Sequence, residues 1–311
     1  MTNYCAMLRV FDVSTIPTLD VAVLGALQLI AEKEIPHLDF SHLERPLILG
    51  SGNAFYTARI LFEDLDADFA DESTYEAALS EPERYDSVVV VSASGKKHAV
   101  DMVKKAIKAG LQTYLITNSP ASPAGDLLSE DAVFFFPKNR EPYTYNTSTY
   151  LTPIFGLTGE DAASVTTFIE KEVTKHLLRN FDDYDAYTLL IPSRFTYARS
   201  MLRTKFDELF GPMVVGRIFT EEEVKHAKTV VSSGRELFIS FGVENEHHGL
   251  VKNRVSVPLP EDVQYGAFLA ISYFVVGKLQ EAHPPYFAQS IERYTQTASR
   301  IFKQDIKPIV E

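Results

Sequence analysis

Short apolar runs alternate with amphipathic stretches over the first 140 residues of the chain. The runs are residues 46–50, 86–92, 112–117 and 132–136. Each is continuously apolar and ends in small or polar residues, which is typical of strands covered on both faces of a parallel sheet. Residues 54–65 and 98–109, between the runs, have apolar positions at helical spacing. This alternation predicts a doubly wound α/β sheet.

A second series of apolar runs follows in the other half of the chain. Its runs are residues 187–191, 213–216, 236–241 and 254–257. Ile48-Leu49-Gly50-Ser51 and Leu190-Ile191-Pro192-Ser193 both join a run to a turn, which suggests a duplicated unit. The expected fold is therefore two doubly wound parallel-sheet halves.

Three further segments complete the predicted organisation. Helical spacing predicts a helix over residues 19–34, a bridging helix over 166–178 and a C-terminal helical segment over 261–303. The polar residues 180–185 are the expected boundary between the halves. The predicted domains are a helical lead-in at 1–45, a first domain at 46–180, and a second domain with the C-terminal helices at 181–311.

The composition is that of an ordinary globular protein, with 45% hydrophobic and 23% charged residues. Disordered, collagen-like and low-complexity classes are excluded on that ground. The longest apolar runs, residues 21–30 and 268–276, are shorter than the roughly 18–20 residues that a membrane span needs. We therefore expect no membrane segment and no targeting segment.

Net charge and cysteine content narrow the class of partner. With a net charge of -12, the chain has no overall attraction for nucleic acid or anionic lipid, so an anionic ligand must be held by a local site. Cys5 is the one cysteine, which excludes an intrachain disulfide framework and cysteine-rich metal sites. A reducing compartment, the cytoplasm, fits this composition.

The loop Ser92-Ala93-Ser94-Gly95-Lys96-Lys97 stands where a predicted strand passes into a predicted helix. Backbone N–H groups and the helix N-terminus, with about half a positive charge, favour a phosphate at such a place. Ser92 and Ser94 can donate hydroxyl hydrogen bonds, and Lys96 or Lys97 can supply a full charge. The alternative is a simple turn and helix cap.

A second glycine-rich turn, Gly50-Ser51-Gly52-Asn53, also follows a strand. It lacks the third glycine of the dinucleotide fingerprint, so a nicotinamide cofactor is the weaker hypothesis. A P-loop is excluded, since the chain has no Gly-x-x-x-x-Gly-Lys-Ser/Thr. Because both turns fall at the carboxyl edge of one parallel sheet, they favour a small-molecule site there.

The order of these motifs resembles the sugar isomerase (SIS) domain. The resemblance includes Ile116-Thr117-Asn118 and Glu141 followed by Asn146-Thr147-Ser148-Thr149-Tyr150. The second half is similar to the tandem-SIS aminosugar enzymes at Thr204-Lys205-Phe206-Asp207-Glu208 and Glu223-Val224-Lys225-His226. The resemblance spans residues 47–257 and implies two SIS-like domains.

The resemblance also implies roles for particular residues. Ser92, Ala93, Ser94 and Lys97 fall on the phosphate loop, Gly52 and Asn53 on the first loop beside it, and Asn146 and Thr147 on the Ser-Thr pair bordering the pocket. Glu208 matches the carboxylate that moves a proton between C1 and C2, and His226 matches the ring-opening histidine. The family commonly assembles its active site across a homodimer or a higher homo-oligomer.

The implied function is a phosphosugar isomerase or an aminosugar-6-phosphate deaminase. Such chemistry needs a carboxylate with a raised pKa and a second acid–base group, for which neutral imidazole is suited. It requires neither a metal nor an organic cofactor. The alternative reading of Glu208 and His226 is that both are solvated surface residues.

Departures from the family pattern keep a second function open. Lys96 and Lys97 replace the acidic and hydroxyl residues of the usual Ser-x-Ser-Gly-Glu-Thr loop, and Ala227-Lys228 replaces the Gly-Pro that follows the histidine. No clear counterpart of the C-terminal Ala-Lys-Ser segment is present. The alternative is a regulatory protein that binds a phosphosugar without catalysis.

A metal site is a further, weaker alternative. Glu244-Asn245-Glu246-His247-His248 together with His226 carries nitrogen and oxygen ligands. Adjacent histidines point in different directions on most backbones, and a loop that ends at Gly249 explains the same residues. We therefore assign no metal ligand.

Overall fold

The computed structural model describes residues 2–177 and 180–311, which form two compact units. Unit 1 comprises Met1–Glu32, Asn139–Ser148 and Glu160–Glu311, and unit 2 comprises Lys33–Lys138 and Thr149–Gly159. The chain therefore passes from one unit to the other more than once. The N-terminal segment groups with the second half, whereas the sequence analysis sets residues 1–45 apart as a lead-in.

Unit 2 contains a parallel five-stranded sheet in the order β2-β1-β3-β4-β5. The strands are β1 (Pro46–Gly50), β2 (Asp68–Ala70), β3 (Ser87–Val91), β4 (Gln112–Thr117) and β5 (Val133–Phe135). All four predicted runs form strands here. Sequence periodicity misses β2, because that strand has three residues and only Ala70 is fully buried.

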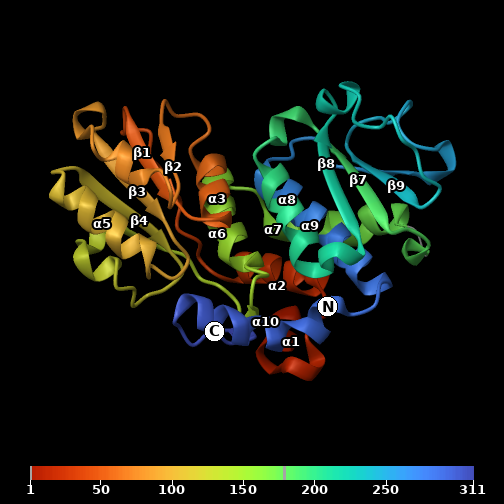
Figure 1. Ribbon diagram of the computed structural model, residues 1–311, viewed down its shortest axis with the longest axis horizontal. Coiled ribbons are helices and arrows are strands. Elements are labelled where there is room, and N and C mark those ends of the chain that lie inside the picture. The colour runs from red at the N-terminus through yellow and green to blue at the C-terminus, as the bar shows by residue number, and fades with distance from the viewer. Residues whose placement is uncertain (1, 178–179) are drawn as a thin grey trace. The chain divides into compact units, whose positions relative to one another are not determined.

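Helices cover both faces of this sheet, α5 (His98–Lys108) on one face and α3 (Asn53–Leu61) on the other (Figure 1). The short α4 (Tyr75–Ala78) belongs to the same unit. Alternate strand residues, Leu47 and Leu49 in β1 and Val88 and Val90 in β3, pack in one cluster with Met102 and its neighbours on α5. The central strands β1 and β3 are almost entirely apolar because both of their faces are buried.

Unit 1 contains a parallel four-stranded sheet in the order β10-β9-β7-β8. Its strands are β7 (Ala186–Ile191), β8 (Val215–Thr220), β9 (Glu236–Phe241) and β10 (Arg254–Val257). Its helices are α1 (Tyr4–Val10), α2 (Leu19–Glu32), α7 (Ala162–Lys171), α8 (Ala198–Phe210), α9 (Tyr265–Ala282) and α10 (Tyr286–Phe302). The α/β class with two doubly wound parallel sheets is confirmed.

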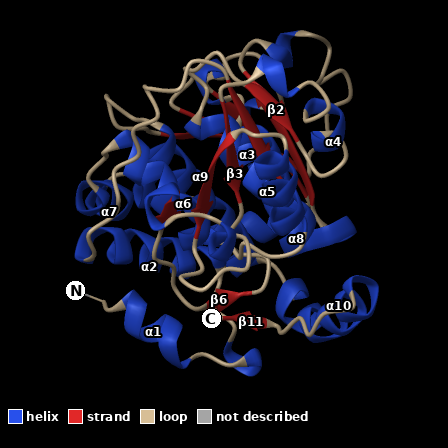
Figure 2. Cartoon of the chain, turned by 90° about the vertical axis from the view of Figure 1, so that its left-hand side faces the viewer, coloured by secondary structure: helices blue, strands red, loops and turns tan. Residues whose placement is uncertain are grey.

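Two short elements close the chain onto an earlier segment. The strand β11 (Ile309–Val310) pairs antiparallel with β6 (Glu141–Pro142), close to the C-terminus in Figure 2. The backbone N–H of Tyr143 also donates to the carbonyl of Pro308 at 2.7 Å. Directly after β6, α6 (Thr147–Thr158) begins in unit 1 and continues into unit 2.

Two predicted elements differ in extent from those observed. The bridging helix is α7, which starts earlier than residue 166 because the Asp161 carboxylate accepts from the N–H groups of Ala163 and Ser164 and caps it there. It ends at Lys171, a 3-10 turn follows at Val173–His176, and the predicted end at Leu178 lies outside the described residues. The predicted strand 213–216 is shifted to β8, because Pro212 and Met213 form a 3-10 turn.

The helix α9 is the most buried helix surface of unit 1, with fifteen buried residues in its eighteen. It packs against α2 at Gly277, where an added Cβ would lie 2.1 Å from the backbone nitrogen of Asp20. Only a glycine permits this approach of the two backbones. In the described part of the chain, no helix is long and apolar enough to cross a membrane.

We expect Gly277→Ala to destabilise the protein by about 1–3 kcal/mol, because the new methyl group meets the α2 backbone, which cannot rotate away. Gly234→Ala is the matched control: an added Cβ there meets nothing within 4 Å, so a change within about 0.5 kcal/mol is expected. Urea denaturation measures both. Equal stability of the two variants would contradict the α2–α9 packing.

Candidate functional site

The loop after β3 is fixed by backbone hydrogen bonds to the neighbouring strand and its connection. The N–H of Ser92 donates to the Ile116 carbonyl at 2.9 Å, and the N–H of Asn118 donates to the Ala93 carbonyl at 2.9 Å. The N–H of Ala124 reaches the Gly95 carbonyl at 3.0 Å. The loop therefore has one backbone path between a buried strand and the start of α5.

Gly95 has a positive φ of 59°, and an added Cβ would lie 2.5 Å from Ser122 Cβ. A larger residue is therefore disfavoured both by conformation and by space. The Gly95 N–H donates to Ser92 Oγ at 3.2 Å, which leaves the Ser92 hydroxyl proton able to donate elsewhere. The Ser-x-Ser-Gly order thus has a local structural reason.

Lys97 precedes the first residue of α5 with φ 50° and ψ -117°. Gly52 holds the equivalent position before α3 with φ 55° and ψ -129°. Both turns enter their helices through a conformation that glycine adopts easily and a lysine adopts only at a cost of about 1–3 kcal/mol. Such strained positions are concentrated at ligand-binding loops.

A cavity of about 210 Å³ opens at this loop. Four of the predicted phosphate-binding residues line it, namely Ser92, Ala93, Ser94 and Lys97. Gly52 and Asn53 form the adjacent turn, but Ser51 and Ala54 are the residues of that segment that line the cavity. Serine hydroxyls, lysines and a helix N-terminus together suit a phosphate group.

Sequence reasoning missed two side chains of the same cavity, His98 and Tyr150. His98 is the first residue of α5 and is exposed, and Tyr150 comes from α6. The position of His98 directly after the loop was a usable signal. Tyr150 had none beyond its place in the Asn146–Tyr150 motif, because more than fifty residues separate it from Ser92.

Glu208 lies on α8 in unit 1 and forms an ion pair with Lys205, at 2.7 Å between Oε2 and Nζ. The Lys205 side chain is 1% exposed and that of Glu208 is 19% exposed. Lys205 also donates to the carbonyls of Thr144 and Tyr145, at 2.9 and 2.8 Å. Sequence reasoning gave Lys205 no role, although it stands three residues before Glu208 and shares its helix face.

Glu141 is a second buried carboxylate in this region of unit 1, 3% exposed. It accepts hydrogen bonds from the backbone N–H groups of Thr147 and Ser148, at 2.6 and 2.7 Å, and so caps the start of α6. Burial raises the pKa of Glu141 and of Glu208, and in both cases the charge of Lys205 opposes that rise. A carboxyl group of raised pKa is suited to proton transfer near neutral pH.

A cavity of about 610 Å³ adjoins Glu208. Its wall is largely apolar and aromatic. The residues of this kind include Phe210, Met213, Tyr286, Phe287, Ile291 and Tyr294. Thr144, Asp207 and Ser290 add polar groups. A carboxylate in this setting is poorly hydrated, which is the physical origin of its raised pKa.

The structure places the remaining predicted residues apart from these two cavities. Asn146 has a positive φ of 48°, and buried Thr147 begins α6 through its bond to Glu141. His226 is exposed after the 3-10 turn Glu223–Lys225 and lines neither cavity. The proposed roles of these three residues stay predictions.

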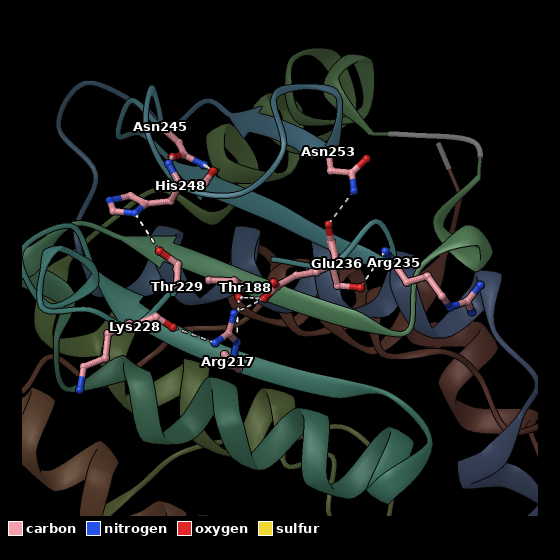
Figure 3. Close-up of polar contacts among 10 residues, drawn as sticks. Thr188, Arg217, Lys228, Thr229, Arg235, Glu236, Asn245, His248 and Asn253 are labelled. Carbon is pink, nitrogen blue, oxygen red and sulfur yellow. Dashed lines mark hydrogen bonds and ion pairs between the residues drawn. The ribbon is translucent and has the colours of Figure 1, made fainter. Parts of the chain in front are cut away.

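The residues of the alternative metal site make loop contacts instead. His248 Nδ1 lies 3.3 Å from Thr229 Oγ1, and the His248 backbone N–H donates to Asn245 Oδ1 at 3.0 Å (Figure 3). Within residues 2–177 and 180–311, no three His, Cys, Asp or Glu side chains are grouped to hold a metal ion.

Comparison with known proteins gives structural but no sequence relatives. No known family profile matches the chain, and no curated protein sequence matches it. Glucosamine-6-phosphate deaminase from Thermotoga maritima matches with a TM-score of 0.58 and 15% identity, over 84% of this chain and 92% of that chain. Tagatose-6-phosphate ketose/aldose isomerase from Escherichia coli matches with a TM-score of 0.54 and 12% identity, over 86% and 89%.

A third structure extends the match over more of the chain. The C-terminal domain of glucosamine-fructose-6-phosphate aminotransferase from Francisella tularensis has a TM-score of 0.52 and 13% identity, over 93% of this chain and 97% of that domain. At these identities the likeness is one of fold. The fold of this chain is therefore similar to the folds of these three proteins.

The raised pKa of Glu208 predicts a pH dependence of stability. The folded protein binds the Glu208 proton more tightly than the unfolded chain, so this group lowers stability increasingly as pH rises from about 4.3, the unfolded value. We expect the unfolding free energy of wild type minus that of Glu208→Gln to fall between pH 4 and pH 8. Urea denaturation across that range measures it.

The control for this experiment is Asp207→Asn, which removes an exposed carboxylate from the neighbouring position of α8. It corrects for the general loss of one negative charge. A wild-type minus Glu208→Gln difference that rises with pH would show that the ion pair with Lys205 outweighs burial, and the raised pKa would be wrong.

Proposed function

We propose that the protein binds a sugar phosphate, with the phosphate group at the Ser92–Lys97 loop. This proposal rests on the cavity at the carboxyl end of β3, which is lined by two serines and two lysines of this loop and by the start of α5. Ligands of open parallel sheets bind at that edge of the strands. In a chain of net charge -12, a local site of this kind is needed to hold any anion.

The names of the structural neighbours support the substrate class. The deaminase acts on glucosamine 6-phosphate and the isomerase on tagatose 6-phosphate, as their names state. Both are SIS-type activities of the kind that the sequence resemblance implies. We extend the phosphosugar class, but no particular sugar, to this chain.

We propose further that the reaction is an aldose–ketose isomerisation or the deamination of an aminosugar 6-phosphate. In the isomerisation Glu208 removes the C2 proton of the open-chain aldose and O1 gains a proton, which gives an enediol. The O2 hydroxyl then loses its proton and the C2 proton returns at C1, which gives the ketose. In the deamination the same transfer from C2 to C1 leaves an imine at C2, water adds to that carbon, and ammonia leaves to give the ketose phosphate. His226 is assigned to ring opening, on the resemblance alone.

A binding-only regulatory protein is the second candidate, and two observations favour it. His226 is exposed and lines neither of the two cavities described above. The wall next to Glu208 is mainly apolar and offers few hydrogen-bond partners for the hydroxyl groups of a sugar. A protein of this kind keeps the phosphate loop without the proton transfer.

The other expectations from sequence remain part of this proposal. They are SIS-like domains at 46–180 and 181–311, with the lead-in at 1–45, a homodimer or higher oligomer that shares its site, and a place in the cytoplasm. Asn146, Thr147, Gly52 and Asn53 are proposed to border the phosphosugar. Sedimentation with and without ligand tests the oligomer.

We expect Ser94→Ala to weaken the binding of its phosphosugar about tenfold or more, because a hydrogen bond to a charged group contributes about 1.5–3 kcal/mol. Isothermal titration against glucosamine 6-phosphate, fructose 6-phosphate and tagatose 6-phosphate, with the free sugars, measures the affinity. Ser129→Ala is the matched control, since Ser129 is exposed in the same unit. Unchanged affinity in Ser94→Ala would overturn the phosphate site.

Glu208→Gln separates the enzyme from the regulatory alternative. We expect turnover to fall by about 10²–10⁴-fold, because the amide cannot take the C2 proton, while the dissociation constant changes less than threefold. Exchange of the C2 hydrogen with deuterium from the solvent, followed by NMR, detects the proton transfer directly. Binding of a phosphosugar by wild type without exchange or turnover would establish the regulatory alternative.

A further inference from the structure

A third cavity, of about 400 Å³, lies in unit 1 beside β8, an edge strand of its sheet. Four basic side chains line it: Arg199 and Arg203 from α8, Arg217 from β8, and Lys228 from the loop after β8. Glu223 is the acidic residue among those that line it. The cavity is thus strongly basic in a chain that is acidic overall.

The packing of α8 on β8 places these side chains together. An added Cβ at Gly216 would lie 2.0 Å from the Phe206 ring, so the absence of a side chain at Gly216 lets the helix approach the strand. Arg199 and Arg203 stand four residues apart on α8 and therefore share one face of that helix. This face borders the same cavity as Arg217.

Two of the four cations are held in place by protein groups. Arg199 pairs with Glu223, whose other carboxylate oxygen accepts from the Thr220 N–H at 3.1 Å. Arg217 donates to the Lys228 carbonyl at 3.0 Å, and it also bonds Thr188 Oγ1 and the buried carboxylate of Glu236 (Figure 3). These guanidinium groups are therefore already oriented, so binding a ligand would cost less side-chain ordering.

The other two cations are Arg203 and Lys228. Both are exposed, and neither forms an ion pair with any residue in 2–177 and 180–311, although the charge of Lys228 also acts on Glu223. The Arg199 and Arg217 charges are balanced by Glu223 and Glu236, so an excess of two positive charges remains at the cavity. Like charges gathered without counterions favour a bound anion.

We propose that this cavity is a second anion site that takes a small organic phosphate monoester. A phosphate monoester carries about -1.5 to -2 charges near neutral pH, which matches the excess of two. One guanidinium group can donate two parallel hydrogen bonds to a phosphate. The volume of the cavity is within the range of about 300–1,000 Å³ for small-molecule sites. A nucleic acid is the poorer fit, because the net charge of -12 repels a long polyanion.

The site is independent of the proposed phosphosugar function. The residues that line it include none from the Ser92–Lys97 loop. They also include neither Glu208 nor any residue of the cavity next to Glu208. Binding here does not depend on whether the first site is catalytic or only binding. Its test therefore needs a readout that distinguishes the two sites.

Lysine footprinting of the full-length protein gives that readout. The protein is acetylated briefly with and without 10 mM glucose 6-phosphate, AMP or inorganic phosphate, with glucose and adenosine as uncharged controls, and each lysine is quantified by mass spectrometry. We expect at least one monoester to slow acetylation of Lys228 threefold or more. Lys252, which is exposed in the same unit, is the internal reference and should not change.

Variants assign the protection to the cavity. Arg203→Met should raise the ligand concentration for half-protection of Lys228 at least tenfold, whereas Arg293→Met, which removes an equally exposed arginine of α10, should leave it unchanged. Ser94→Ala should also leave it unchanged, while Lys96 and Lys97 report on the first site separately.

Three results would overturn the proposal. Lys228 could react equally with and without every phosphate, or Arg203→Met could leave the protection intact. Protection by inorganic phosphate but by neither monoester would overturn the assignment to an organic phosphate.

Discussion

The interior of unit 1 depends on the hydrogen bonds and the ion pair that the buried ammonium group of Lys205 forms. This group binds the carbonyls of Thr144 and Tyr145 and the carboxylate of Glu208, and so ties the segment before α6 to α8. Removing such a charge from water costs several kcal/mol, which these partners offset. The loss of any one of them would leave the buried charge less compensated.

The same interaction sets the chemistry available at Glu208. A carboxylate beside an apolar cavity would be driven toward its protonated form by burial, and Lys205 limits that tendency. Burial and the charge of Lys205 act on Glu141 in the same way, and its carboxylate oxygens also accept hydrogen bonds from the first N–H groups of α6. The structure therefore holds one carboxylate as a helix cap and leaves the other at a cavity wall.

An acidic protein that attracts anions must do so locally. At the proposed phosphate site, the Ser92–Lys97 loop offers backbone N–H groups, hydroxyl groups and two lysines around a cavity of about 210 Å³. At the proposed site beside β8, guanidinium groups are fixed by Glu223 and Glu236, and Arg203 and Lys228 are in excess. A ligand in direct contact with such groups lies within the screening length of about 8 Å, so physiological salt weakens these short-range attractions less than it weakens long-range ones.

Local sequence determined most of the strands and helices and the turn at Ser92–Gly95. The apolar runs at β1 and β3 are buried on both faces, and the need for glycine at Gly95 follows from its backbone conformation. Contacts between distant residues were decided only by the tertiary structure. These contacts depend on packing between elements, which no local pattern encodes. They include the contact of Lys205 with Tyr145, that of Tyr150 with the Ser92 loop, and the grouping of Arg203 with Arg217 and Lys228.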